Sequence, residues 1–135
     1  MNITVTRRVV FSSGHRLYNP DFSDEKNRAV FGSCSNPNGH GHNYILEVSV
    51  NGPVDDDTGM IINLKELKDI INREIFEKVD HKNLNNDVDF MAGLIPTTEN
   101  FAAAIFRILD DKLGAGRLSK IVLRESENNS VEVNR

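Results

Sequence analysis

The residues best suited to chemistry lie within Gly32 to Tyr44, GSCSNPNGHGHNY. This stretch holds Cys34, the only cysteine of the 135-residue chain, and two of its four histidines, His40 and His42. A cysteine thiolate can act as a nucleophile, a base or a metal ligand, and a neutral imidazole is a common ligand of zinc. The stretch therefore indicates a metal site, thiol chemistry, or both in one site.

The H-x-H pair opens an alternating segment, HNYILEVSV (residues 42–50), which is typical of a half-buried strand. Side chains two residues apart on a strand share a face, so His40 and His42 can hold a metal together. His15 ends the β-rich N-terminal segment and becomes a third ligand if the two strands are neighbours. Three imidazoles suit Zn²⁺ and leave a fourth position for water or substrate. We therefore predict zinc as the cofactor.

Cys34 has three possible roles: a fourth zinc ligand in a closed structural site, an inert buried thiol, or a nucleophile or base beside the metal. The five residues SNPNG separate it from His40 and favour a turn. The catalytic role needs an activator, because an ordinary thiol is mostly protonated at about pH 7. Asp80 and His81, in VDHKNLN, can supply one if the segments meet, with the carboxylate orienting the imidazole. Spacing alone leaves all three roles open.

Composition narrows the class of protein. A length of 135 residues and 39% hydrophobic content fit one soluble domain over residues 1–135. A formal net charge of −4 argues against a nucleic-acid partner. No apolar run approaches the length of a membrane span, and the first residues lack the apolar core of a signal peptide. With a single cysteine, no internal disulfide can form, so we expect a reducing, cytoplasmic location.

The remaining segments predict the elements that position these residues. Residues 3–12 are expected to form a strand, and residues 42 to about 62 a hairpin whose second arm begins at Met60. Helices are expected from Asn63, with Glu66 as its capping partner, and from Thr97 or Thr98 to Leu113, before Gly114. Their apolar faces are Leu64, Leu67, Ile70, Ile71 and Ile75 in the first helix, and Phe101, Ile105, Ile108 and Leu109 in the second.

Two short segments near the end of the chain, SKIVLRES (residues 119–126) and SVEV (residues 130–133), are expected to form paired strands. Hairpin-type connections dominate over regular strand–helix–strand crossovers. This order favours an α+β fold with an antiparallel sheet covered on one face by two helices.

Six motifs in order, FSSGHRL, GSCSNPNGHGHNY, DTGMIINLKELK, VDHKNLN, PTTENFA and the glutamate of RESENN, resemble the 6-pyruvoyl-tetrahydropterin synthase family over nearly the whole chain. The resemblance implies the tunnelling fold, a four-stranded antiparallel sheet with two helices on one face. It also implies a trimeric barrel and a dimer of trimers, a homohexamer with active sites at subunit interfaces. The implied reaction converts 7,8-dihydroneopterin triphosphate into 6-pyruvoyl-tetrahydropterin, with elimination of triphosphate and no external reductant.

The resemblance also implies a role for each site residue. His15, His40 and His42 match the zinc ligands, and Cys34 matches the general base. Asp80 and His81 match a relay that a neighbouring subunit contributes. Glu125 matches the carboxylate that anchors the pterin ring, and Thr97, Thr98 and Glu99 match the lining of the pterin pocket. Without the resemblance, Glu125 reads as a solvent-facing strand residue and Thr97 to Glu99 as an ordinary helix start.

Two alternatives compete with this function. One is 6-carboxy-tetrahydropterin synthase of queuosine biosynthesis, which has similar ligands and substrate but releases acetaldehyde. In that branch the cysteine lies nearer to the H-x-H pair, so the five-residue spacing here favours the pyruvoyl branch. The other is a non-catalytic zinc-binding module in which Cys34 completes a closed four-ligand site.

Overall fold

The computed structural model describes residues 1–114 and 116–135, and within them the chain forms one five-stranded sheet with the order β3-β1-β2-β4-β5. The pairs β1/β2, β2/β4 and β4/β5 are antiparallel, whereas β1/β3 is parallel. The strands are β1 (Thr4–His15), β2 (His40–Asn51), β3 (Lys82–Asn83), β4 (Leu118–Arg124) and β5 (Ser130–Asn134). The expected four-stranded antiparallel sheet is therefore wrong: a fifth strand, β3, is present, and it pairs with β1 in parallel. The two residues of β3 are too few to produce an alternating pattern in the sequence.

The long pair β1/β2 forms the middle of the sheet. Its register runs from Thr4 opposite Asn51 to His15 opposite His40. The second neighbour of β2 is β4, so the hairpin predicted over residues 42–62 is wrong. Residues 52–63 form a loop instead, in which the Asp55 carboxylate accepts hydrogen bonds from the backbone N–H groups of Asp57 and Thr58. Ile62, which belongs to this loop, is buried in the core. The apolar residues of the loop therefore gave a sequence pattern like that of a strand.

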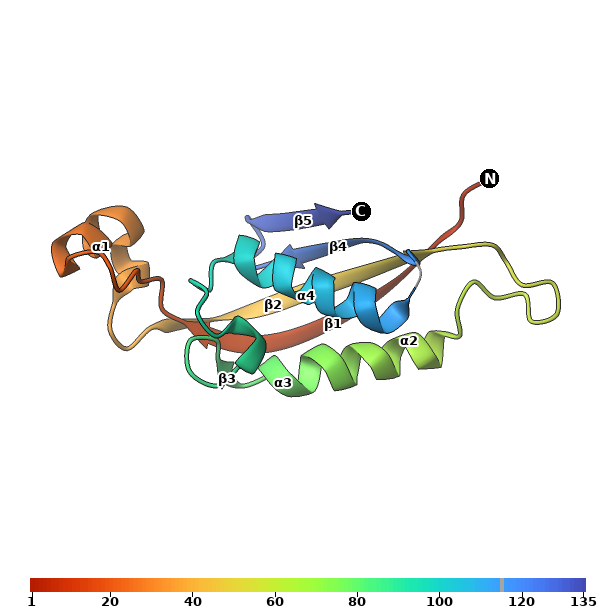
Figure 1. Ribbon diagram of the computed structural model, residues 1–135, viewed down its shortest axis with the longest axis horizontal. Coiled ribbons are helices and arrows are strands. Elements are labelled where there is room, and N and C mark those ends of the chain that lie inside the picture. Colours follow the sequence, from red (N-terminus) through yellow and green to blue (C-terminus); the bar gives the residue numbers. More distant parts are fainter. Residues whose placement is uncertain (115) are drawn as a thin grey trace.

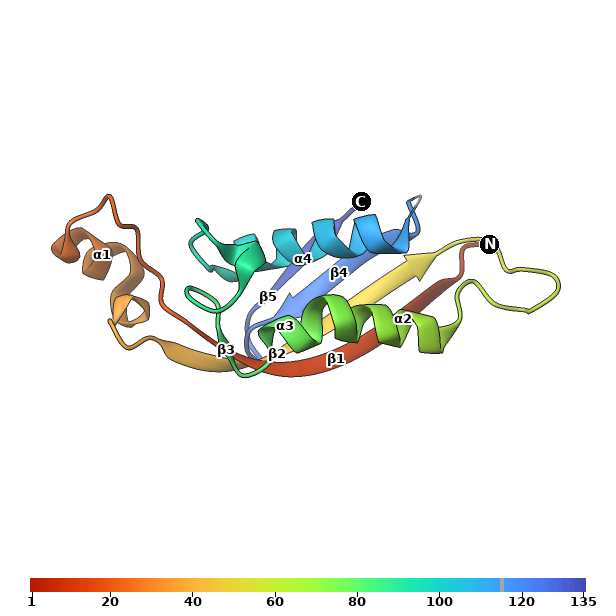
Figure 2. The same ribbon diagram turned by 60° about the horizontal axis from the view of Figure 1, so that its bottom comes forward.

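The two predicted helical regions are confirmed. The first comprises α2 (Leu64–Ile71), a π-helical turn (Asn72–Phe76) and α3 (Glu77–Val79). The side chain of Asn63 caps α2 by accepting from the N–H of Lys65. The second is α4 (Thr98–Leu113), which ends at Gly114 as expected. Figures 1 and 2 show α2 and α4 covering one face of the sheet.

The core lies between this face and the helices. Alternate residues of β2 point into it, which confirms the predicted strand face. Of the expected face of α2, Leu64 is exposed because it is the first residue of the helix, while the following apolar residues are buried. Fully buried side chains from the sheet and both helices include Tyr44, Leu46, Val48, Val50, Leu67, Ile75, Phe101, Ile105, Leu109, Ile121 and Leu123.

Residues 16–39, which we call the arm, project beyond one end of the sheet and carry α1 (Asp24–Phe31) (Figure 1). A short 3₁₀ turn (Gly32–Ser35) follows α1. Two hydrogen bonds fix the base of the arm: Leu17 N–H donates to Cys34 O at 2.8 Å, and Arg16 Nε donates to Ser35 O at 2.8 Å. In the described part of the chain, no helix has the length and apolarity needed to cross a membrane.

Candidate metal centre and active site

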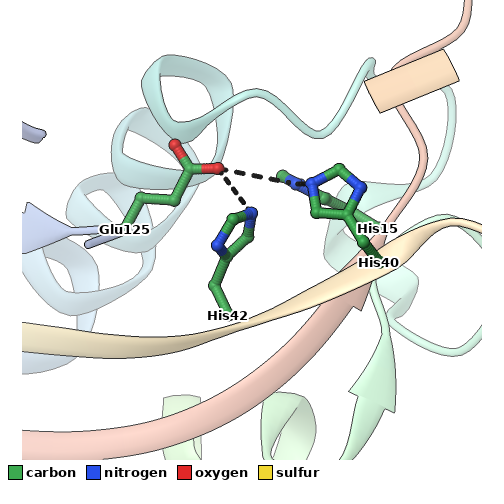
Figure 3. Close-up of side chains that lie close together, drawn as sticks. All are labelled: His15, His40, His42 and Glu125. Atoms are coloured by element: carbon green, nitrogen blue, oxygen red, sulfur yellow. Dashed lines mark hydrogen bonds and ion pairs between the residues drawn. The ribbon is translucent and has the colours of Figure 1, made fainter. Parts of the chain in front are cut away.

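The ends of β1 and β2 bring three histidines together on the helix-covered face of the sheet. His15 and His40 are opposite each other in the register, and their Nε2 atoms lie 3.2 Å apart. His42 is two residues further along the same strand, so its ring shares the face of His40. The ring centroids of these three residues lie 4.8 to 5.1 Å apart. The three imidazoles therefore surround one point (Figure 3).

Glu125 completes the group. It follows β4 directly, and its Oε1 atom lies 2.8 Å from His42 Nε2 and 3.6 Å from His15 Nε2. The candidate ligand atoms of all four residues lie within 4.8 Å of one another. Reasoning from residue spacing did not place Glu125 at this site. Its position depends on the pairing of β2 with β4, in which Arg124 lies opposite Ile45, and no local sequence pattern encodes that pairing.

The His15 ring is buried and oriented by the backbone. Its Nδ1 atom lies 2.8 Å from the carbonyl oxygen of Pro96, so Nδ1–H donates and Nε2 keeps its lone pair for the centre of the group. Burial lowers the pKa of His15 most, and the neighbouring His40 and His42 lower it further. The Pro96 and Glu125 oxygens oppose this shift. The neutral imidazole is thereby favoured, which is the form that binds a metal.

The group fits a divalent metal ion. Among the described residues, the buried Nε2 atom of His42 has no hydrogen-bond partner. Glu125 Oε1 is close, but the approach of the two groups does not have hydrogen-bond geometry. An unsatisfied buried nitrogen costs free energy, and a metal ion at the centre would satisfy it. Three imidazole nitrogens and a nearby carboxylate oxygen are donors that suit Zn²⁺.

The start of α4 holds the other oxygen of Glu125. Thr98 Oγ1 donates to Glu125 Oε2 at 2.8 Å, and Thr98 is 7% exposed. Thr97 caps the helix by accepting from Asn100 N–H, as the PTTEN motif predicts. Glu99 is exposed and makes no contact with the histidines among the described interactions. Thr98 is therefore the residue of this segment that acts on the site through a direct bond.

Cys34 lies in the 3₁₀ turn of the arm and is half-buried. Among residues 1–114 and 116–135, the group able to hold a metal comprises the three histidines and Glu125 and does not include Cys34. The arm connects Cys34 to the metal centre through the hydrogen bond of its carbonyl oxygen to Leu17 N–H, two residues after His15. Cys34 is thus joined through its backbone to the segment that follows His15, and its thiol is not one of the grouped candidate ligands.

Asp80 and His81 form a pair at the outer edge of β1. His81 Nδ1 lies 2.8 Å from Asp80 Oδ2, and Asp80 Oδ1 accepts from Ser12 N–H at 3.0 Å. The hydrogen bond from Ser12 lowers the pKa of Asp80 most, and His81 adds to this effect against a smaller effect of burial. His81 has a φ of 58°, unusual outside glycine, and its side chain is 82% exposed. Within the described residues no hydrogen bond or ion pair joins this pair to Cys34.

Comparison with known proteins gives a consistent result. The family model described as 6-pyruvoyl tetrahydropterin synthase matches residues 4–135. The human protein named 6-pyruvoyl tetrahydrobiopterin synthase is 47% identical over 127 residues, which cover 94% of this chain and 88% of the human one. A putative 6-carboxy-5,6,7,8-tetrahydropterin synthase of Archaeoglobus fulgidus is 34% identical over 96 residues, covering 71% of this chain and 76% of that protein.

A solved structure shows the same relationship in three dimensions. The 6-pyruvoyl tetrahydropterin synthase of Caenorhabditis elegans superposes with a TM-score of 0.93 at 35% sequence identity, covering 100% of this chain and 96% of the other. The match extends over the sheet, both helices and the arm, since the whole chain is covered. The protein described here belongs to the 6-pyruvoyl tetrahydropterin synthase family.

Proposed function

We propose that this protein is a zinc-dependent lyase that converts 7,8-dihydroneopterin triphosphate into 6-pyruvoyl-tetrahydropterin with elimination of triphosphate. The observation that carries the proposal is the convergence of His15, His40, His42 and Glu125 at one point of the sheet. The names of the relatives support the same reaction, because several are 6-pyruvoyl tetrahydrobiopterin synthases that match most of this chain.

The three histidines are the proposed ligands of Zn²⁺. When bound, the ion would act as a Lewis acid toward the side-chain oxygens of the substrate and so acidify the adjacent carbons. His15 is held for this role by Pro96, and His40 and His42 by the alternation of β2. The ligand atoms are set by the paired ends of two strands, which is a rigid support for a binding site.

Glu125 is the proposed anchor of the pterin ring. Its carboxylate carries a hydrogen bond from Thr98 and lies beside the histidines without a hydrogen bond to His42. Lone pairs on both oxygens therefore stay available for the paired N–H groups of a pterin, a bidentate contact of the kind that makes recognition specific. Thr97 and Glu99, which flank Thr98, are the proposed lining of the ring pocket.

Cys34 is the proposed general base, which takes a proton from a side-chain carbon of the substrate. His81, oriented by Asp80, is the proposed acceptor of the thiol proton, which leaves Cys34 as the thiolate. The side chain of His81 is 82% exposed, so it is accessible to the Cys34 of a neighbouring subunit, the arrangement we propose for the relay. Only the thiolate can act as the base, so the proposed contact with His81 matters for the rate.

The proposed assembly is a homohexamer, made of two trimers whose sheets close into barrels. The edges of the sheet support closure between copies. Among the described residues, β1 pairs with β3 only at Ser13 and Gly14, so most of the outer edge of β1 carries no strand, and β5 forms the opposite edge. Pairing of such edges between subunits removes exposed backbone groups and closes a barrel.

Product analysis tests the proposed reaction. Purified zinc-loaded protein is incubated with 7,8-dihydroneopterin triphosphate, and the products are identified by mass spectrometry. We expect 6-pyruvoyl-tetrahydropterin and free triphosphate. A carboxy product together with acetaldehyde would replace the proposal by the 6-carboxy reaction, and unchanged substrate would favour the non-catalytic zinc module.

A further inference from the structure

We propose that the cleft between the arm and the loop of residues 83–95 binds the triphosphate group of the substrate, an inference that rests on the proposed function. The cleft has a volume of about 420 Å³. The arm supplies one wall and the loop after β3 supplies the other. The lining residues that carry the proposal are Arg16, Tyr18, Asn38, Asn83, Asn85 and Asn86.

The cleft lies next to the proposed metal centre along the chain. Three of its lining residues each adjoin a group of that centre in the chain: Arg16 follows His15, Gly39 precedes His40, and Ile95 precedes Pro96. The backbones also meet in space, since a Cβ atom built on Gly39 would lie 2.7 Å from the carbonyl oxygen of His15. A ligand with side-chain oxygens at the metal centre can therefore extend its terminal phosphates into this cleft.

The charge of the cleft suits an anion. Among the described residues that line it, Arg16 carries the only charged side chain, and none of them is a carboxylate. This contrasts with the chain as a whole, whose formal net charge is −4. The described clefts that hold lysines also hold acids: Lys82 is accompanied by Asp87 in one, and Lys78 and Lys112 by Glu74 and Asp111 in another. Repulsion between carboxylates and phosphates makes those clefts poorer sites for triphosphate.

Two contacts hold the Arg16 guanidinium in place. Its Nε atom donates to Ser35 O at 2.8 Å, and its central carbon lies 4.0 Å from the centre of the Tyr18 ring. No ion pair in the described part of the chain neutralises it. The stacked group keeps its terminal nitrogens for phosphate oxygens, a planar arrangement that suits bidentate contacts.

Asparagine amides complete the cleft. Asn85 joins the loop to the base of the arm, since Arg16 N–H donates to Asn85 Oδ1 at 2.7 Å and Asn85 Nδ2 donates to Arg16 O at 2.9 Å. These two hydrogen bonds fix the distance between the two walls of the cleft, the base of the arm and the loop. Asn38 on the arm and Asn86 on the loop add neutral amide donors on opposite sides. A fixed cation flanked by neutral donors is suited to a polyanion that must leave after the reaction.

Steady-state kinetics of the zinc-loaded protein test the proposal. The variants are Arg16→Gln and Asn86→Asp, the second of which adds a negative charge without removing the Arg16 bonds. Arg107→Gln, an exposed arginine of α4 outside the cleft, is the matched control. Each variant is measured with 7,8-dihydroneopterin triphosphate as substrate and with 7,8-dihydroneopterin, which lacks the phosphates, as competitive inhibitor.

We expect kcat/KM to fall by about 10- to 100-fold in Arg16→Gln, as the loss of a charged hydrogen-bonding group predicts. We also expect kcat/KM to decrease in Asn86→Asp, whereas kcat/KM of Arg107→Gln should equal that of the wild type. The inhibition constant of 7,8-dihydroneopterin should stay unchanged in all three. Unchanged kcat/KM in both cleft variants would overturn the proposal, and so would an equal loss of inhibitor binding. Lack of turnover by the wild type would instead refute the proposed function itself.

Discussion

The Nε2 atoms of His15 and His40 lie 3.2 Å apart across the last residue pair of β1 and β2. Because His15 donates from Nδ1 to Pro96, its neutral ring can only accept at Nε2, so a hydrogen bond between the two Nε2 atoms requires that His40 donate. The paired ends of β1 and β2 hold the two rings side by side. The proposed metal binding therefore requires no new strand pairing.

Removal of the metal should consequently leave the fold intact. Chelation is expected to preserve the β-sheet signal in circular dichroism and to lower the melting temperature only by the loss of ligand binding energy. His40→Ala should lose bound metal and activity together, as measured by elemental analysis and turnover, since it removes a ligand. His81→Ala is the matched control and should retain its metal. Unfolding of the chelated protein would show that the metal is structural.

Cys34→Ala separates metal binding from chemistry. The thiol lies outside the metal-binding group, so the variant should keep its metal content and its melting temperature. Turnover should fall by about 100-fold or more, the usual effect of losing a general base. Loss of metal in Cys34→Ala would instead identify the thiol as a ligand.

Gly39 is expected to set the distance between His15 and His40, two of the proposed metal ligands. It has a φ of 68°, and an added Cβ would lie 2.7 Å from His15 O, a contact that forces the backbone to move. Gly39→Ala should weaken metal binding by about 10-fold or more, as outer contacts of metal ligands commonly do. Competition with a coloured chelator measures the affinity.

Gly59→Ala is the control for Gly39→Ala. Gly59 has a similar φ of 72°, but a Cβ there would meet no atom within 4 Å. It should lose stability from backbone strain alone, by about 1 kcal/mol, with unchanged metal affinity. Equal metal affinities in the two variants would show that the close approach to His15 has no role in the site.

Asp80 should make stability depend on pH in a defined direction. Its folded-state pKa is lowered, chiefly by the hydrogen bond from Ser12, so ionised Asp80 stabilises the fold above its unfolded pKa of about 3.9. This contribution is lost as the pH falls through the lower folded pKa. Asp80→Asn should therefore be less stable than the wild type at neutral pH, and the difference should shrink under acid. Urea unfolding at several pH values tests this, and a constant difference would contradict it.

Short sequence patterns predicted the strands and helices whose formation depends on neighbouring residues. The alternation of β2, the caps Asn63 and Thr97, and the end of α4 at Gly114 all follow from short-range chemistry. The short helix α1 was missed because its eight residues, DEKNRAVF, contain few apolar side chains and bury only Asn27. A helix without an apolar stripe leaves no periodic signal.

The sequence predicted those parts of the candidate site that depend on residues close together in the chain or on neighbouring strands. His40 and His42 come together through strand alternation alone, and His15 required only that β1 and β2 be neighbours. Glu125 joins them through the pairing of β2 with β4, two strands separated by both helical regions. That long-range pairing is a property of the folded core. From the sequence, Glu125 was predicted as a site residue only because its segment resembles a family motif.

The division of roles between the histidines and Cys34 is the central claim, and X-ray absorption at the zinc edge of the loaded wild-type protein tests it most directly. We predict a first coordination shell of nitrogen and oxygen atoms, with three histidine nitrogens at about 2.0 Å and no sulfur. A sulfur atom in that shell at about 2.3 Å would contradict the account, because it would make Cys34 a ligand in a closed structural site.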